Sequence, residues 1–329
     1  MTRLMIYGAT GYTGRMAAAH ARAAGLDLIL AGRDETRLAE LGRSLGVEHR
    51  VFTLNHDAAI DAALQDVAIL LNCAGPFQRT ADPLIRGVIR AGTHYLDIAV
   101  ELDSYRLAEA YDAQAQAAGV MLLPGSGGSV AMLGSLAGRA AERVGRPHTI
   151  RVALHVAGAM SRGSAISAAE NLTGDCLERV DGALRICEPG TTQNFNFGSG
   201  PVTCFPVTLP DLVTLWKALQ APNIGTFVHV SGSAFPTGDL MALPDGPPAE
   251  ERDANRYQAV VEMTGTGGET VRAILDTVNG YSFTSLAAAE AARRVLAGEA
   301  RSGFQTPAGL FGHGFAETIA DTTIHILQD

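Results

Sequence analysis

Three glycines near the amino terminus have the spacing of a phosphate-binding turn. Gly8, Gly11 and Gly14 follow a short apolar segment and open an alanine-rich segment with helical character. The first glycine permits a tight turn, the second lets backbone N–H groups approach a pyrophosphate, and the third lets the helix lie close to the strand. The helix N-terminus then faces the anion. The pattern predicts dinucleotide binding, and a purely structural strand-to-helix turn is the alternative. The other residues of this turn expected to contact the dinucleotide are Thr10, Tyr12 and Thr13.

An arginine at the end of the second expected strand indicates which dinucleotide is bound. The strand ends at Gly32-Arg33, where an NAD enzyme carries a carboxylate for the ribose 2′-hydroxyl. Gly32 has no such group, and Arg33 offers a planar, charged fork to a 2′-phosphate. The sequence therefore predicts NADP(H). The alternative is a surface arginine paired with Asp34 or Glu35.

Small residues and a proline follow the fourth expected strand, in the segment 72–77. The end of a parallel strand lies at the carboxyl edge of its sheet, where the ribose and nicotinamide must pass. A simple loop is the alternative for this segment. The remaining candidate cofactor-binding residues at strand ends are Asn55, Ala74, Gly75, Pro76, Phe77 and Asp97.

The fifth expected strand carries polar groups that could take part in catalysis. Its segment 94–101 places Tyr95, Asp97 and Glu101 at or just beyond the carboxyl edge. A carboxylate there could orient the cofactor or substrate, or act as a general acid or base. Alternatively, Asp97 and Glu101 cap the following helix. The candidate catalytic residues are Glu101, Tyr95 and Ser126.

Further polar residues lie in the second half of the chain, without a motif that assigns them a role. They are His155, Ser161, Ser164, Tyr281 and His313. A tyrosine followed four residues later by a lysine, as short-chain dehydrogenases use, does not occur, because Lys217 is the only lysine and no tyrosine precedes it at that spacing.

The order of these motifs resembles that of the saccharopine dehydrogenase-like oxidoreductase family. The segments that carry the resemblance are G-A-T-G-Y-T-G, A-G-R, N-C-A-G-P-F and G-T-H-Y-L-D-I-A-V-E, and the likeness returns at 280–281 and 303–308. The resemblance implies hydride transfer with a nicotinamide cofactor to or from a C=N or C=C bond of a small molecule. It also implies that Gly8, Gly11, Gly14 and Arg33 bind NADP(H).

The loop after the sixth expected strand departs from the family pattern. Relatives commonly carry a Cys-Gly-Phe-Asp-type sequence here, whereas this chain reads Leu123-Pro124-Gly125-Ser126-Gly127-Gly128-Ser129. Ser126 and Ser129 either bind a polar substrate atom or belong to a glycine-rich helix entry. The missing Cys and Asp leave open a catalytically idle NADP(H)-binding sensor or regulatory protein.

Alternating strand-like and helix-like segments must position these residues. The rhythm predicts an α/β fold, a Rossmann-type doubly wound parallel sheet formed by six strands. The expected strands are 4–7, 26–31, 50–54, 67–73, 95–99 and 120–123. Asp82-Pro83 predicts the start of the helix after the fourth strand. Residues 1–145 are therefore expected to form an NADP(H)-binding Rossmann domain.

The pattern changes after a helix expected over 130–144. Residues 149–156 alternate apolar and polar side chains, and 257–264 and 269–277 form two alternating runs around a Gly-rich turn. Residues 146–280 are thus expected to form a substrate and dimerisation α+β domain with a largely antiparallel sheet and loops between 188 and 201. Residues 281–329 are expected to form a C-terminal helix and tail that return to the Rossmann domain.

Composition limits the partners that the chain is expected to have. The net charge of −9, with scattered arginines, predicts no nucleic-acid or anionic-membrane partner. Every apolar run ends well before about 20 residues. The four cysteines form no zinc motif and no disulfide framework, so no metal is expected, and a reducing cytoplasm is the simplest location. A small-molecule substrate and a homodimer complete the expectations.

Overall fold

The computed structural model describes residues 2–171, 175–188, 190–232 and 238–327. Two compact units divide the chain. The first contains residues 1–128 and 284–306, and the second contains 129–283 and 307–329. These boundaries differ from the expected segments 1–145, 146–280 and 281–329, because the helix after the sixth strand belongs to the second unit and the tail is shared. The functional roles expected for those segments stay predictions.

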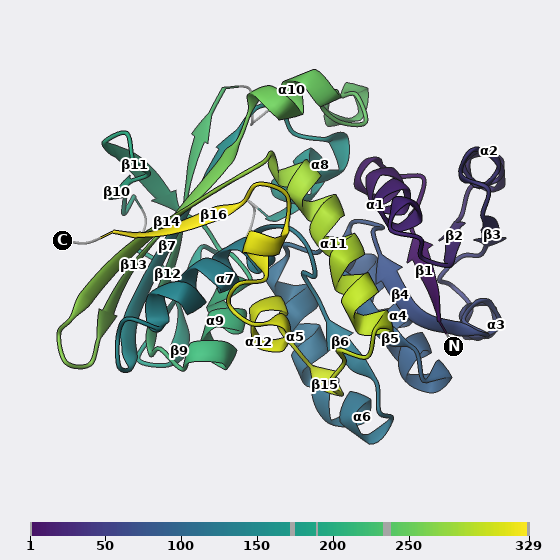
Figure 1. Cartoon of the computed structure of the whole chain (residues 1–329), viewed down its shortest axis with the longest axis horizontal. Coiled ribbons are helices and arrows are strands. Elements are labelled where there is room, and N and C mark those ends of the chain that lie inside the picture. Colours follow the sequence, from purple (N-terminus) through teal and green to yellow (C-terminus); the bar gives the residue numbers. More distant parts are fainter. Residues whose placement is uncertain (1, 172–174, 189, 233–237, 328–329) are drawn as a thin grey trace. The chain divides into compact units, whose positions relative to one another are not determined.

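The first unit is built on a seven-stranded, wholly parallel sheet in the order β15-β6-β5-β4-β1-β2-β3 (Figure 1). Its strands are β1 (Arg3–Tyr7), β2 (Leu28–Gly32), β3 (Glu48–Val51), β4 (Val67–Asn72), β5 (His94–Asp97), β6 (Met121–Leu123) and β15 (Gly303–Phe304). The central strands are apolar and buried, as a sheet covered on both faces requires. The expected doubly wound sheet is confirmed, and a seventh strand from the C-terminal tail extends it.

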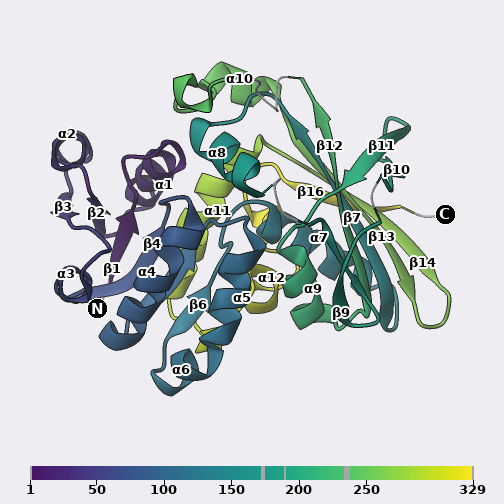
Figure 2. The same ribbon diagram turned by 180° about the vertical axis from the view of Figure 1, so that it is seen from behind.

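Helices connect these strands. They are α1 (Tyr12–Ala23), α2 (Glu35–Leu45), α3 (Asp57–Ala63), α4 (Phe77–Ala91), α5 (Leu102–Ala110), α6 (Asp112–Ala117) and the later part of α11 (Gly280–Leu296). Figure 1 shows α1 and α11 over one face of the sheet, and Figure 2 shows α4 and α5 over the other. This division follows from right-handed crossovers that proceed from β1 in opposite directions along the sheet.

Helix α4 begins earlier than the Asp82-Pro83 pair predicts. It starts at Phe77, which is buried, and Pro83 lies inside the helix. The pair therefore does not mark the helix start, because burial of Phe77 stabilises the turns before Pro83. The helix ends at Gly92, whose φ of +69° suits a residue without a side chain.

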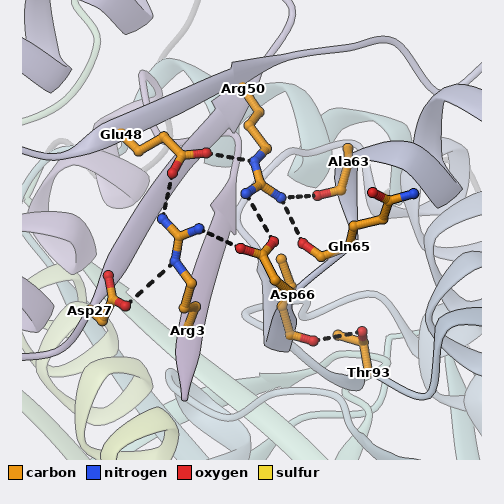
Figure 3. Close-up of polar contacts among 9 residues, drawn as sticks. Arg3, Asp27, Glu48, Arg50, Ala63, Gln65, Asp66 and Thr93 are labelled. Carbon is orange, nitrogen blue, oxygen red and sulfur yellow. Dashed lines mark hydrogen bonds and ion pairs between the residues drawn. The ribbon is translucent and has the colours of Figure 1, made fainter. Parts of the chain in front are cut away.

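A cluster of charged side chains lies at the amino edge of this sheet, where the strands begin (Figure 3). Arg3 forms ion pairs with Asp27, Glu48 and Asp66 at 3.4, 2.5 and 2.7 Å. Arg50 pairs with Glu48 and Asp66 at 2.8 and 2.9 Å. Two arginines therefore join the beginnings of β1, β2, β3 and β4.

The second unit is built on a nine-stranded sheet. In its described residues β7 and β12 are parallel, and every other pair of neighbouring strands is antiparallel. Its strands are β7 (Pro147–Ala157), β8 (Leu177–Val180), β9 (Ala183–Ile186), β10 (Gln193–Asn196), β11 (Pro201–Pro206), β12 (Asn223–Ser231), β13 (Tyr257–Gly265), β14 (Thr270–Thr277) and β16 (Thr323–Leu327). The expected hairpin over 257–277 is confirmed. Residues 193–196, expected within loops, form β10 because Phe195 is buried against Phe227.

The second unit also contains five helices in its described residues. They are α7 (Ser129–Ala141), α8 (Arg162–Asn171), α9 (Asp211–Leu219), α10 (Ala249–Ala254) and α12 (Pro307–Phe311), with short 3₁₀ turns at Leu240–Ala242 and Ala316–Thr318. Helix α7 is almost wholly buried and contacts β7, β13 and β14. Across the described ranges, no helix is both long and apolar enough to cross a bilayer.

Candidate functional site

Close backbone contacts shape the turn between β1 and α1. Gly8 has a φ of +81°, and a Cβ there would lie 2.7 Å from the amide N of Ala74. A Cβ on Gly14 would lie 2.2 Å from the carbonyl O of Gly8. Real Cβ atoms do not approach backbone atoms this closely, so both positions require glycine. The turn after β1 therefore lies directly against the segment that follows β4.

The N-terminus of α1 has the properties of an anion-binding site. Its N-cap residue is Gly11, which has no side chain to occupy the free backbone donors, and its first turn carries no acidic residue. Arg15 Nη1 and Arg37 Nη2 donate to the carbonyl O of Thr10 at 2.8 and 3.0 Å. Backbone donors, the helix dipole and two guanidinium groups at this turn fit a dinucleotide pyrophosphate.

Arg33 lies exposed directly after β2. Asp34 is occupied as the N-cap of α2, because its Oδ1 accepts from the backbone N of Arg37 at 3.0 Å. Within the residues that the structure describes, Arg33 forms no ion pair with Asp34 or Glu35, so the pairing considered as an alternative is not present. The guanidinium of Arg33 is thus available for a 2′-phosphate.

Arg37 is absent from the residues predicted from the sequence, although it reaches the glycine turn from the first turn of α2. A single arginine in a helix belongs to no motif. The only available signal is its position four residues after Arg33, one helical turn further along the chain.

A closed set of hydrogen bonds fixes the turn after β4. The backbone N of Ala74 donates to Asn72 Oδ1 at 3.0 Å, and Asn72 Nδ2 donates to Thr80 Oγ1 at 3.0 Å. Thr80 Oγ1 in turn donates to the carbonyl O of Ala74 at 2.7 Å. The Gly75–Pro76 peptide bond is cis, and Phe77 then begins α4. The predicted cofactor-binding segment 74–77 therefore has a defined shape beside Gly8.

Asp97 is the centre of a buried hydrogen-bond network at the same edge. Strand register pairs it with Asn72, and Tyr95 OH donates to Asp97 Oδ2 at 2.9 Å while accepting from Asn72 Nδ2 at 3.2 Å. The backbone N atoms of Gly125 and Ala99 donate to Asp97 Oδ1 at 2.7 and 3.0 Å. Burial raises the pKa of Asp97 to about 6, against the opposing effect of these hydrogen bonds. The network joins the ends of β4, β5 and β6.

The three candidate catalytic residues differ in how their polar atoms are used. Ser126 is fully buried, and both its backbone N and its Oγ donate to the carbonyl O of Asp97 at 2.8 Å. Tyr95 OH donates to the carboxylate of the same residue. Glu101 is 3% exposed, its Oε2 accepts from the backbone N of Val100 at 3.0 Å, and its Oε1 has no partner among the described residues. Of the three candidates, Glu101 is therefore the one with a side-chain oxygen that accepts no hydrogen bond from the described residues.

The structure also decides whether the acidic residues cap α5. Glu101 is the N-cap residue, yet its side chain makes no capping hydrogen bond, and the carboxylate of Asp97 binds other groups. Neither carboxylate therefore caps α5.

The last predicted cofactor-binding residue, Asn55, lies exposed in the turn after β3. Strand ends thus bring the turns after β1, β4, β5 and β6 together, while Arg33 and Asn55 follow the outer strands β2 and β3.

The polar candidates of the second half all make hydrogen bonds within the second unit. The pairs are His155 with Ser231, Ser161 with Ser164 and with Tyr281, and His313 with Glu142. Burial lowers the pKa of His155. No group of three or more His, Cys, Asp or Glu side chains in the described ranges could hold a metal ion.

Comparisons with known proteins bear on the first unit and on the fold. Residues 4–123 match the family described as Saccharopine dehydrogenase NADP binding domain. The trans-acting enoyl reductases of Mycobacterium ulcerans (strain Agy99) and Mycobacterium bovis (strain BCG / Pasteur 1173P2) are 33% and 30% identical to the chain over 106 residues. Each match covers 30% of this chain and 25% of the relative, so the chain spans about a quarter of the length of these relatives.

A solved structure matches over the whole chain. Saccharopine dehydrogenase (L-Glu forming) from Saccharomyces cerevisiae aligns over 100% of both chains with a TM-score of 0.68 at 13% sequence identity, which shows a common fold. The fold of this chain is therefore one already known in that enzyme. Residues 4–123 are therefore similar to the saccharopine dehydrogenase NADP binding domain.

Proposed function

We propose that the chain is an NADP(H)-dependent oxidoreductase that transfers a hydride to or from a C=N or C=C bond of a small molecule. The observation that carries this proposal is the turn at Gly8 to Gly14. A Cβ would meet backbone at 2.7 Å or less at both ends of it, and the N-cap residue of α1 is a glycine without a side chain. When bound, NADP(H) would supply the hydride.

The residues of the first unit would divide the work of binding this cofactor. The backbone of Gly8, Gly11 and Gly14 and the first turn of α1 would hold the pyrophosphate. Arg33 would form charge-assisted hydrogen bonds to the 2′-phosphate, with Arg37 adding positive charge beside the turn. The segment 74–77 would line the path of the nicotinamide half.

The buried network around Asp97 would act by positioning. Tyr95 and Ser126 both donate to Asp97, so we assign them the task of holding the ends of β4, β5 and β6 in place. Glu101 keeps a buried oxygen without a partner among the described residues, and we propose it as the group that orients substrate or exchanges a proton with it.

Calorimetric titration with NADPH and NADH tests the cofactor assignment. Arg33→Ala is expected to weaken NADPH binding by about 5- to 150-fold, since a hydrogen bond to a charged group contributes about 1–3 kcal/mol, and to leave NADH binding nearly unchanged. Arg43→Ala removes a matched exposed arginine from the last turn of α2 and should change neither affinity. Equal weakening of both cofactors by Arg33→Ala would contradict the assignment.

A catalytically idle NADP(H)-binding sensor is the second candidate, and one observation favours it. The hydroxyls of Tyr95 and Ser126 are both consumed in internal hydrogen bonds. Single-turnover loss of NADPH absorbance with imine and enoyl compounds distinguishes the two proposals. Turnover that falls on Glu101→Gln supports the oxidoreductase, whereas cofactor binding without turnover across a broad panel supports the sensor.

A cytoplasmic location and a homodimer through the second sheet belong to the same proposal. The charge and cysteine content of the sequence support the first, and resemblance to the family supports the second. Light scattering on the purified chain at micromolar concentration checks the dimer, for which we expect a mass near twice 34.4 kDa.

A further inference from the structure

Two cysteines lie opposite each other in the hairpin formed by β8 and β9. The ladder of this hairpin pairs Leu177 with Ile186, so the next pair along it is Cys176 with Cys187. The backbone N of Cys187 donates to the carbonyl O of Cys176 at 2.8 Å, which extends the antiparallel pairing by this one step. The ten residues that separate them in the sequence form no recognisable cysteine motif.

The geometry of an antiparallel ladder suits a covalent link at this position. Directly opposed residues project to the same face, and their Cα atoms lie about 5.5 Å apart where they form a hydrogen-bonded pair. This separation falls within the range of roughly 4.4–6.8 Å that a disulfide spans. Both side chains are half-buried. Burial, and then a hydrogen bond with the Cys176 thiol, raises the pKa of Cys187 to about 12.

Contacts at the turn of the hairpin keep the two strands in register. Arg179 Nε donates to the carbonyl O of Leu212 at 3.0 Å, and its guanidinium lies 4.8 Å from the centroid of the Trp216 ring. The backbone N of Gly182 donates to the carbonyl O of Pro222 at 2.8 Å. Because the turn is fixed, the cysteines at the other end stay opposite each other.

We propose that Cys176 and Cys187 form a reversible intrachain disulfide when the protein meets a mild oxidant of the peroxide class. The raised pKa of Cys187 keeps that thiol protonated, so the attacking thiolate is Cys176. It attacks the peroxide O–O bond, which gives a sulfenic acid on Cys176 and one water after proton transfer. The second thiol then displaces the sulfenic hydroxyl as a second water, and the S–S bond forms. Two thiols lose two electrons, which reduce one hydrogen peroxide to two waters. A dithiol reductant reverses the link by thiol–disulfide exchange.

Thiol counting on the full chain tests this proposal. The protein is treated with a small excess of hydrogen peroxide, its remaining thiols are labelled with N-ethylmaleimide under denaturing conditions, and its intact mass is measured. We expect four labels on the reduced chain, two after oxidation, and four again after dithiothreitol. A loss of two labels with the chain still monomeric by non-reducing electrophoresis identifies an intrachain link.

Peptide mapping identifies which cysteines are joined. Trypsin separates Cys176, in residues 163–179, from Cys187, in residues 186–217. The second peptide also contains Cys204, so the mapping uses the Cys204→Ala variant. We expect a cross-linked pair of peptides that is absent from both Cys176→Ser and Cys187→Ser.

The serine variants are conservative substitutions. The thermal midpoint of each reduced variant is compared with that of the reduced wild type, so that loss of the link is not confused with loss of the fold. Four labels after oxidation of the folded wild type would overturn the proposal, as would a link that persists in Cys187→Ser or one that joins two chains. None of these measurements uses nucleotide binding or turnover, so their outcome is independent of the proposed function.

Discussion

The two edges of the parallel sheet in the first unit carry opposite kinds of polar chemistry. At the amino edge, Arg3 and Arg50 pair with exposed carboxylates, and hydrogen bonds from Arg3 lower the pKa values of Glu48 and Asp66 (Figure 3). At the carboxyl edge, the acidic group at the centre of the network is Asp97, which is 1% exposed and has a raised pKa. Charges are satisfied by solvent and by ion pairs at one edge, and by buried neutral donors at the other.

This difference indicates separate tasks for the two edges. Exposed ion pairs contribute little energy each and tolerate change, so they suit a structural edge. A buried network with few alternatives fixes geometry, which a ligand site needs. Variants at the carboxyl edge should therefore change nucleotide binding, and variants at the amino edge should change stability alone.

Gly14→Ala is expected to have the largest effect at the carboxyl edge. The added Cβ would lie 2.2 Å from the carbonyl O of Gly8, so α1 must move away from the turn. We expect NADPH affinity to fall by about 100-fold or more, because the backbone donors no longer converge on the pyrophosphate. Calorimetric titration together with a thermal melt measures both consequences.

Gly163→Ala is the matched control for this variant. Gly163 lies in α8, and a Cβ there would meet nothing within 4 Å. It should leave NADPH affinity unchanged and stability equal or slightly higher. If Gly14→Ala binds NADPH as well as this control does, the role of the glycine turn is wrong.

Asp97→Asn is expected to have the next largest effect, and the effect depends on pH. The folded-state pKa of Asp97 is raised from 3.8 to about 6, so its contribution to stability is fully present below pH 4 and is lost as pH rises through 6. Asparagine has no such titration. Between pH 4 and 7 the free energy of unfolding of the variant should therefore rise by about 2 kcal/mol relative to the wild type.

A carboxylate at the amino edge, Glu48, is expected to show the opposite pH dependence. Glu48 has a lowered pKa, so its contribution is present at neutral pH and is lost as pH falls through the folded value. Urea unfolding of Glu48→Gln is measured across the same pH range. As pH rises, its free energy of unfolding should fall relative to that of the wild type, which is opposite to the change expected for Asp97→Asn. Parallel curves for wild type and Asp97→Asn would show that burial does not control the titration of Asp97.

Local signals in the sequence account for the parts of the fold that could be predicted. Buried parallel strands are near-continuous apolar runs, and β13 and β14 are two strand-like runs on either side of a glycine-rich turn. Strand β10 was not predicted, because two of its four residues are asparagines. It forms a strand because Phe195 packs against Phe227. Strand β15 has two residues and depends on β6 as a neighbour.

The residues of the candidate site also divide into those with a local sequence signal and those that depend on tertiary contacts. The glycine turn and the segment 74–77 are contiguous in sequence, so their type and position could be predicted. The use of Tyr95 could not, because its hydroxyl is bound through the register that places Asn72 beside Asp97. Partners on neighbouring strands are tertiary information that no single segment carries.

Arg3→Met is expected to lower stability without changing nucleotide affinity. The variant loses three ion pairs, but their carboxylates are 43–59% exposed, so we expect a loss of about 1 kcal/mol in the free energy of unfolding. The loss should shrink between 50 and 500 mM salt, because mobile ions screen exposed charges. Urea unfolding at both salt concentrations measures it.

Arg106→Met serves as the control for Arg3→Met. Arg106 is 59% exposed, with a single carboxylate at 3.9 Å, and its removal should leave stability unchanged. A tenfold fall in NADPH affinity on Arg3→Met would mean that the amino edge also serves the site, and the separation of tasks would not hold.

Asn55→Ala and Gln65→Ala compare two exposed amides at opposite edges and are expected to have the smallest effects. Asn55 follows β3 and Gln65 precedes β4, so the side chains differ mainly in the edge at which they lie. One neutral hydrogen bond to the cofactor contributes about 0.5–1.5 kcal/mol, so Asn55→Ala should weaken NADPH binding by about 2- to 12-fold. Gln65→Ala should leave it unchanged, and both variants should melt as the wild type does. Equal NADPH affinities for the two variants would exclude Asn55 from the site. The nucleotide site would then be confined to the ends of the strands nearer β1.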